Sequence, residues 1–195
     1  VAAGHTSSDL DYKATTSLSV PIPNPGTKIE KFTNLANRDV FVNGNYVYTA
    51  CYVGLSIIDI SDPTNPGNSV YEMFSGAMGV DVLGNYAYVA AGSKGLAIID
   101  INNKANPGTP VYRDTSGGAR NVSVVGNYAY LADKDSGLAI IDISDPTNPG
   151  SPVYKDTNGS AWGVTVVGNY AYVADDTSGL AIIDISDPTS PGTPV

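Results

Sequence analysis

The sequence predicts an all-β protein, a β-propeller of four-stranded antiparallel blades with about four blades in this chain. The first observation is a fixed period: the Gly-Asn-Tyr triplet begins at Gly44, Gly84, Gly126 and Gly168, in steps of 40, 42 and 42 residues. Repeats of this length are typical of propeller blades. The second is that strings rich in Val, Ile and Tyr are interrupted at regular places by 21 Gly and 13 Pro, which favours short strands over helices.

The last two copies of the repeat are almost identical. Residues 124–149 and 166–191 differ at 4 of 26 positions, and looser copies begin at Phe41 and Asp81. We therefore expect residues 1–23 to be an N-terminal extension and residues 24–195 to be propeller repeats. The expected blades lie near residues 34–74, 75–115, 116–157 and 158–195, the last together with residues 28–33.

Each repeat contains four expected strands, here named A to D. In the third repeat strand A is Asn121–Val125, and strand B, Tyr128–Ala132, follows a Gly-Asn pair that is typical of a two-residue hairpin. Strand C, residues 138–143, is a nearly continuous apolar run, which indicates burial on both faces. A Pro-containing connection leads to strand D at residues 153–157. Strands buried on both faces fit a blade that lies between two neighbouring blades.

The ring requires closure, because an open arc leaves apolar faces and strand edges in water. Residues 23–40 align with residues 147–164, so residues 28–33 stand where a strand D is expected, and the last repeat stops after its strand C. Three arrangements remain open. The N-terminal strand completes the last blade of its own chain, or that of a neighbouring chain in a larger ring or polymer, or the chain is a fragment of a longer protein.

Composition and charge exclude several classes of partner. The net charge of −9 and the pI near 4.2 disfavour nucleic acid and anionic membrane surfaces. A single cysteine, Cys51, excludes an intrachain disulfide and a cysteine zinc cluster. The chain has no apolar run of about 18 residues that would span a membrane. Its first residues lack the pattern of a signal peptide and are compatible with a mature N-terminus.

The repeat resembles a known family. The strings GNYAYVAD and SGLAIIDISDPTNP are similar to those of LVIVD-repeat β-propellers, and the resemblance extends over roughly residues 24–195. It implies a propeller fold and an extracytoplasmic location in bacteria or archaea. It implies no catalytic residues.

Variation among the repeats indicates a binding face. The B–C turns differ between repeats, whereas the Gly-Asn hairpins and the SDPTNPG turns are nearly constant. The D–A connections end at equivalent positions in Arg38, Met78, Arg120 and Trp162. Because strands alternate in direction, these connections and the B–C turns project from one side, and loops on a rigid scaffold commonly carry function. Trp and Arg dominate binding surfaces, so these four residues are the predicted ligand-binding residues. The alternative is that Trp162 only fills space beside the axis and that the arginines are solvated.

Weaker patterns suggest other sites. Asp133 and Asp135 resemble the start of a calcium loop, although the later Gly and Glu of such a loop are absent, so calcium is a weak prediction beside a solvated turn. Asn158 and Asn121 each begin a glycosylation sequon, and Asn158 is the better candidate because Asn121 is expected near the axis.

No catalytic residues are predicted. The only histidine, His5, lies in the N-terminal extension, and Cys51 has no histidine near it in the pattern to activate it. An aspartate ends strand C of every repeat and is expected to bond backbone N–H groups in a turn: Asp59, Asp100, Asp142 and Asp184. The predicted function is a secreted or cell-surface module that binds protein or glycan and can self-assemble. The alternative is a hydrolase or lyase acting on extracellular polysaccharide.

Overall fold

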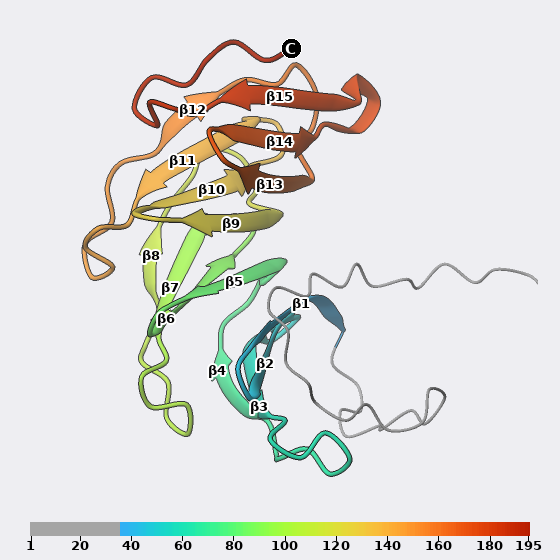
Figure 1. Ribbon diagram of the computed structural model, residues 1–195, viewed down its shortest axis with the longest axis vertical. Coiled ribbons are helices and arrows are strands. Elements are labelled where there is room, and N and C mark those ends of the chain that lie inside the picture. Colours follow the sequence, from blue (N-terminus) through green and yellow to red (C-terminus); the bar gives the residue numbers. More distant parts are fainter. Residues whose placement is uncertain (1–35) are drawn as a thin grey trace, which may run out of the picture.

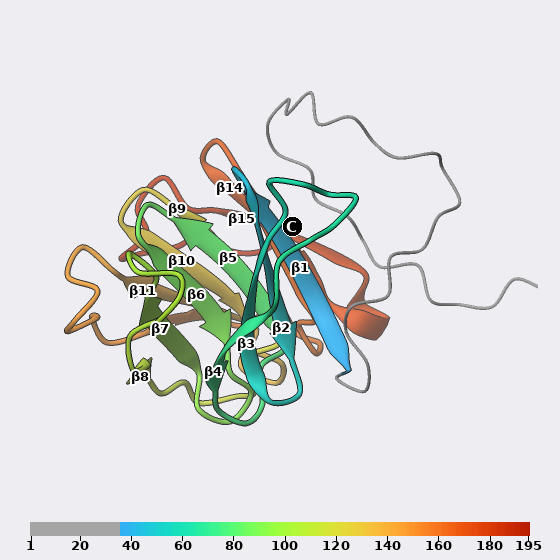
Figure 2. The ribbon, with the colours of Figure 1, turned by 90° about the horizontal axis from the view of Figure 1, so that it is seen from below.

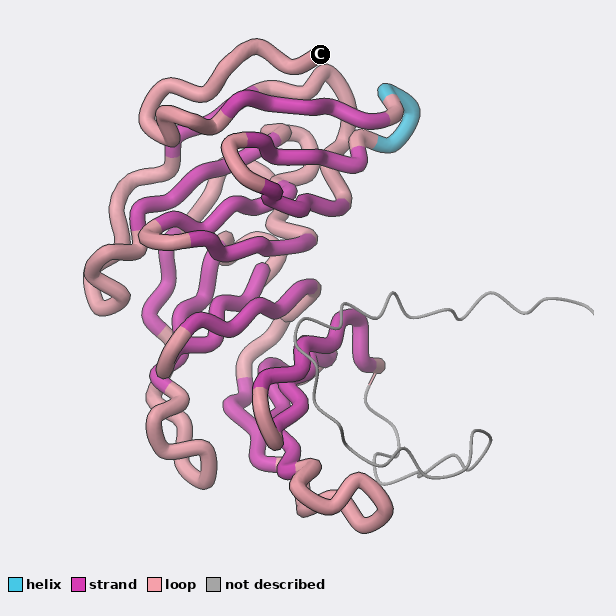
Figure 3. The backbone as a smooth tube through the Cα atoms, viewed as in Figure 1, coloured by secondary structure: helices cyan, strands magenta, loops and turns pink. Residues whose placement is uncertain are grey.

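The computed structural model describes residues 36–195, and this part of the chain is almost entirely β-structure (Figures 1 and 3). The first sheet contains β1 (Asn37–Asn43), β2 (Tyr46–Cys51), β3 (Gly54–Asp59) and β4 (Val70–Met73). The second contains β5 (Gly79–Leu83), β6 (Tyr86–Ala90), β7 (Leu96–Asp100) and β8 (Val111–Arg113). The third contains β9 (Asn121–Val125), β10 (Tyr128–Ala132), β11 (Leu138–Asp142) and β12 (Val153–Lys155). The fourth contains β13 (Gly163–Val167), β14 (Tyr170–Ala174) and β15 (Leu180–Asp184), with the 3-10 turn η1 (Asp176–Ser178) between the last two.

Each sheet is an antiparallel meander whose strands lie in sequence order. The first strands of neighbouring sheets contact one another, β1 with β5, β5 with β9 and β9 with β13, so the sheets follow one another along an arc. Figure 2 shows the sheet of β1–β4 standing beside that of β5–β8. This is the predicted β-propeller, with the first strand of each sheet at the inner edge of its blade. No helix within residues 36–195 combines the length and the apolar character that crossing a membrane requires.

The hairpins confirm the sequence pattern. β9 and β10 are joined through Gly126-Asn127, with Tyr128 opposite Val125, and Gly126 has φ of 58°, which glycine adopts without steric cost. The outer strands are shorter than expected: the strand predicted at residues 153–157 is Val153–Lys155. It ends early because Thr157 turns away to bond Asp175 of the next blade.

The core lies between the blades. Tyr130, Leu138 and Ile140 of the third blade pack against Val173 and Ile183 of the fourth, and all five are buried. We call the face that carries the second Tyr of strand B the trailing face of a blade. The face that packs onto the preceding blade is its leading face. Both faces of a middle blade are therefore apolar, which explains the continuous apolar strands.

The aspartates at the ends of the third strands are structural, as predicted. The N–H two residues farther on donates to each carboxylate at 2.8 Å; the acceptors are Asp59, Asp100, Asp142 and Asp184. A glycine N–H also donates to the carbonyl of the same aspartate, as from Gly150 to Asp142 at 2.8 Å. These bonds fix the turn on the side that the repeats keep constant.

The inner strands are joined by hydrogen bonds from one blade to the next. Asp39 accepts the Val80 N–H at 2.9 Å, and Asp81 accepts the Val124 N–H at 2.8 Å. Asn121 accepts the Val164 N–H at 3.1 Å. A side chain of each of the first three blades thus satisfies a backbone N–H on the inner edge of the following blade.

The fourth blade has three strands in the described part of the chain. Val195 pairs with Ile182 as Val153 pairs with Ile140 in the third blade, through two backbone bonds of 3.0 and 3.1 Å. The trailing face of this blade is open: Leu180 is 59% exposed, whereas the equivalent Leu138 is fully buried. The segment expected to supply a fourth strand, residues 28–33, lies outside the described residues.

Removing the Asp81 carboxylate tests the bonds between blades. We expect D81A to lower the free energy of unfolding by about 1–3 kcal/mol, because it removes charge-assisted bonds and leaves the Val124 N–H without this acceptor. Urea denaturation measures the change. The control D114A removes an exposed carboxylate of equal charge and should change the free energy of unfolding by less than about 0.5 kcal/mol. Equal losses in the two variants would contradict this role for Asp81.

Candidate functional site

The B–C turns and the D–A connections lie on one side of the molecule, as the sequence predicts. Backbone bridges join Gly92 to Ala119 and Lys134 to Ala161, in each case a B–C turn with the end of the D–A connection beside it. This side is therefore built from the segments that differ among repeats.

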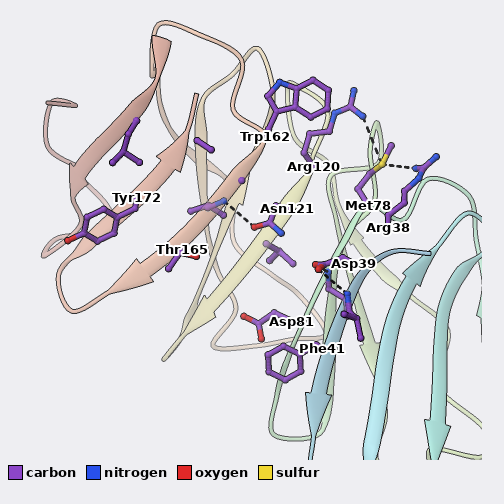
Figure 4. A pocket seen from close by; sticks show the side chains of 17 residues that line it. Arg38, Asp39, Phe41, Met78, Asp81, Arg120, Asn121, Trp162, Thr165 and Tyr172 are labelled. Carbon is purple, nitrogen blue, oxygen red and sulfur yellow. Dashed lines mark hydrogen bonds between the residues drawn. The ribbon is translucent and has the colours of Figure 1, made fainter. Parts of the chain in front are cut away.

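The four predicted ligand-binding residues come together at the mouth of a cavity on this side (Figure 4). The cavity has a volume of about 550 Å³ and is lined by the inner strands of all four blades. Arg38, Met78, Arg120 and Trp162 occupy equivalent positions at the starts of β1, β5, β9 and β13. We call these four side chains the mouth cluster.

The mouth cluster is a continuous row of contacts. The Met78 sulfur lies 2.6 Å from Nη1 of Arg38 and 4.0 Å from Nη1 of Arg120. The Arg120 guanidinium lies over the Trp162 ring, 4.8 Å from its centre, in a cation–π arrangement. Arg38 also donates to the Ala77 carbonyl at 3.3 Å and lies 5.8 Å from the Tyr52 ring centre. The row therefore places one cation, Arg120, over a Trp162 ring that is 50% exposed, and a second cation, Arg38, on the other side of Met78.

Deeper in the cavity the side chains are polar. Asp39 and Asn121 each follow a mouth-cluster residue directly in the sequence. Asp81 and Thr165 come three residues after the mouth-cluster residues of their own strands (Figure 4). The Asp39 carboxylate accepts the N–H groups of Val40 and Val80, which hold it in place. One wall of the cavity is the open trailing face of the fourth blade, where Tyr172 and Leu180 are found.

These deeper residues line the candidate site, and the sequence interpretation did not include them among the ligand-binding residues. They vary among repeats just as the mouth cluster does, with Asp39, Gly79, Asn121 and Gly163 at one equivalent position. That variation was the available signal. It did not reveal which of them bond to a neighbouring blade, because this depends on the distance between inner strands.

The structure gives the two predicted calcium ligands different partners. Asp133 is fully buried, and its oxygens accept the Thr115 hydroxyl at 2.7 Å and the Gly117 N–H at 2.9 Å. The Asp135 carboxylate pairs with Lys134 at 3.2 Å and accepts the Ser160 hydroxyl at 3.1 Å. Within residues 36–195 no three His, Cys, Asp or Glu side chains are grouped so that they could share a metal ion. Asp133 thus connects the second blade to the third.

Burial changes the titration of Asp133. Desolvation raises the pKa of this carboxyl above its ordinary value of 3.8, while the bonds from Thr115 and Gly117 act in the opposite direction. A carboxyl with a raised pKa binds its proton more tightly in the folded state. Its contribution to stability is therefore greatest in acid and falls as the pH rises from about 3.8 through the folded-state pKa.

The remaining sequence candidates occupy ordinary positions. Asn158 is exposed in a turn with φ of 68°, whereas Asn121 faces the cavity and bonds Val164. Cys51 is buried, and burial raises the pKa of its thiol, which lies 3.2 Å from the Gly54 carbonyl oxygen. His5 lies outside the described residues.

Comparison with known proteins identifies the repeat. The family model of the LVIVD repeat matches residues 36–70, 76–111, 116–152 and 158–193, which together make up most of the chain. No sequence among the curated proteins matches the chain.

Solved structures share the fold at low sequence identity. The β-propeller domain of Swd1 from Myceliophteria thermophila matches with a TM-score of 0.61 and 12% identity, over 78% of this chain and 54% of that chain. BamB from Moraxella catarrhalis matches with a TM-score of 0.56 and 17% identity, over 74% of this chain and 42% of BamB. The computationally designed protein Ika4 matches with a TM-score of 0.60 and 12% identity, over 78% of this chain and 92% of Ika4. The chain thus spans about half of the two natural chains, and the likeness shows the fold alone.

The hydrogen bond from Thr115 to Asp133 provides a pH-dependent test. We expect T115V to lower the free energy of unfolding by about 1–3 kcal/mol at pH 7, because a buried carboxylate loses a donor. The loss should be smaller at pH 4, where more of the carboxyl is protonated. Urea denaturation at the two pH values measures it, with the exposed Thr109 changed to Val as the control. A loss that does not depend on pH would contradict this assignment.

Proposed function

This chain belongs to the LVIVD-repeat family of β-propellers, and we propose that it acts as a binding module for a protein or glycan ligand. The ligand docks on the side that carries the B–C turns and the D–A connections. The observation that carries the proposal is the mouth cluster: four residues from four repeats form one continuous row at a cavity of about 550 Å³. A volume in this range is typical of ligand sites in proteins.

The state of the acidic groups favours binding over catalysis. Asp39 and Asp81, the carboxylates that line the cavity, both accept backbone N–H bonds within and between blades. A general acid or base must exchange protons with a substrate, whereas these carboxylates hold inner strands together. The arrangement therefore supports recognition by the arginines and the tryptophan at the mouth.

We place this activity outside the cytoplasm, at the cell surface or in the secreted fraction. The support is the resemblance of the repeat to extracytoplasmic LVIVD proteins. A sequon at the exposed Asn158 is compatible with this location.

We also propose that copies of the chain associate through the trailing face of the fourth blade. Tyr172, Ala174, Leu180 and Ile182 repeat the residues that, in the second and third blades, pack onto the leading face of the next blade. Leu180 is 59% exposed, and Tyr170, at the other end of β14, is 46% exposed. The leading face of a blade is the surface complementary to such a trailing face, so we propose a blade of a second copy as the partner.

Substitutions in the mouth cluster test the binding proposal. We expect a double variant, R38Q with W162A, to lose at least about tenfold in affinity for whichever glycan or peptide on a mixed array the wild-type protein binds, because it removes a cation and an aromatic anchor. Fluorescence anisotropy with the captured glycan or peptide measures the affinity. The control M73A removes an exposed side chain from the outer strand β4 and should leave affinity unchanged. Wild-type affinity in the double variant would place the binding site elsewhere.

Substitution on the open face tests self-association. We expect L180E to shift the protein to the monomer mass in sedimentation equilibrium, because it places a charge in an apolar contact. Its free energy of unfolding should change by less than about 0.5 kcal/mol, since Leu180 is exposed in the single chain. The matched variant L83E alters an exposed leucine of the second blade and should associate as the wild type does. A monomeric wild type, or equal association of all three proteins, would refute the proposal.

A further inference from the structure

We propose that the mouth cluster binds a carboxylated sugar, such as a uronic acid unit of an acidic polysaccharide. The sugar carboxylate lies between Arg38 and Arg120, and the sugar ring lies against Trp162. This inference rests on the proposed function, because it names the ligand class of the same site. It begins from the charge at the mouth, which is opposite in sign to the net charge of −9.

Neither arginine forms a close ion pair with a carboxylate in the described part of the chain. The ion pair found there joins Lys134 to Asp135. The contact that Arg38 and Arg120 share is the Met78 sulfur, a weak acceptor without charge. Arg120 Nε is also buried without an acceptor among the described residues. Two guanidinium groups held close together repel each other, and an anion that bonds both relieves the repulsion.

The acidic side chains near the mouth are already engaged. Asp39 and Asp81 accept backbone N–H groups of the inner strands. Asp135 is held by Lys134 and Ser160, which lower the pKa of its carboxyl, with a smaller effect from Arg120. A carboxylate on a ligand would supply the anion that the two arginines lack among residues 36–195. A carboxylate matches the planar guanidinium group, which can bond both of its oxygens.

Trp162 and the polar lining favour a sugar over an acidic peptide. The Trp162 ring is half exposed beside the Arg120 guanidinium, so an aromatic surface and a cation adjoin each other at the mouth (Figure 4). A sugar acid presents the matching pair, an apolar ring face and a carboxylate on the same ring. Below the mouth, Asn121, Thr165 and Tyr172 supply amide and hydroxyl groups that can bond sugar hydroxyls. An acidic peptide would use the charges but would leave the ring and the hydroxyl groups unmatched.

Titration calorimetry with defined probes tests the inference. The probes are an oligogalacturonate trimer, its neutral methyl ester, maltotriose and a triglutamate peptide. We expect the oligogalacturonate to bind more tightly than the other three, with an affinity that falls as salt is added. R38Q and R120Q should each weaken it by about 10-fold to 100-fold, the range for a hydrogen bond to a charged group.

Three further variants make the result specific. W162A should weaken oligogalacturonate binding by about tenfold or more, while having little effect on any binding of triglutamate. K155Q, in the outer strand β12, removes one positive charge away from the mouth and should leave the affinity unchanged. R120K keeps the charge but loses the two-pronged donor, so an intermediate affinity is expected. If R120Q unfolds, as judged by circular dichroism, R38Q and R120K give the same test.

The outcomes separate this inference from the proposed function. If triglutamate binds as tightly as oligogalacturonate, and W162A changes the affinity for neither probe, the sugar assignment is wrong. The proposed location of the binding site is then retained. If oligogalacturonate does not bind while an array ligand depends on the mouth cluster, the inference again fails and the proposed function holds. If oligogalacturonate binds the wild type and all of the mouth variants equally, both are wrong.

Discussion

Each blade of this protein has two apolar faces, and covering both of them requires a blade on either side. The packing of one trailing face on the next leading face buries Tyr130, Leu138 and Ile140 against Val173 and Ile183, and the same residue types recur in the second blade. This burial is the main favourable term in the fold, since full burial of one such side chain is worth about 1.5–3 kcal/mol. The near identity of the repeats follows from it, because every interface must fit the same shape.

The same constraint decides where the chain is free to vary. Residues of the third strand cannot change without opening a cavity on one face or the other. The side chains at the starts of the inner strands line the axial cavity, and of these four only Met78 also packs against the core between two blades. Positions 38, 78, 120 and 162 are far apart in the sequence, yet the arc makes them neighbours. A change at Arg38, Arg120 or Trp162 therefore alters one part of the mouth without removing a side chain from the cores between blades.

Much of the fold could be predicted because it follows from local pattern and period. The Gly-Asn hairpins, the turn aspartates such as Asp142, and the common side of the variable turns are each set by residues close in the sequence. The gathering of Arg38, Met78, Arg120 and Trp162 also followed from the period. The roles of Asp39, Asp81 and Asn121 did not, because they depend on how far one inner strand lies from the next. The partners of Asp133 could not be read from its turn either, because Thr115 and Gly117 belong to the connection from the preceding blade.

Near-identical repeats pose a further problem, which is that blades could pair in the wrong order. The inner strands differ in sequence between repeats, and these differences disfavour pairing of blades in the wrong order. At the position after the mouth cluster, polar residues alternate with glycine: Asp39, Gly79, Asn121 and Gly163. A side chain at position 79 would begin with a Cβ only 2.8 Å from the Cα of Asn121, so the second blade must have glycine where the third has asparagine. Gly79 has no side chain that could reach the third blade. The Val124 N–H of the third blade therefore donates to Asp81, two residues farther along the second blade. The acceptor thus changes position from one interface to the next, and a first or third blade placed where the second stands would bring a side chain into this steric clash.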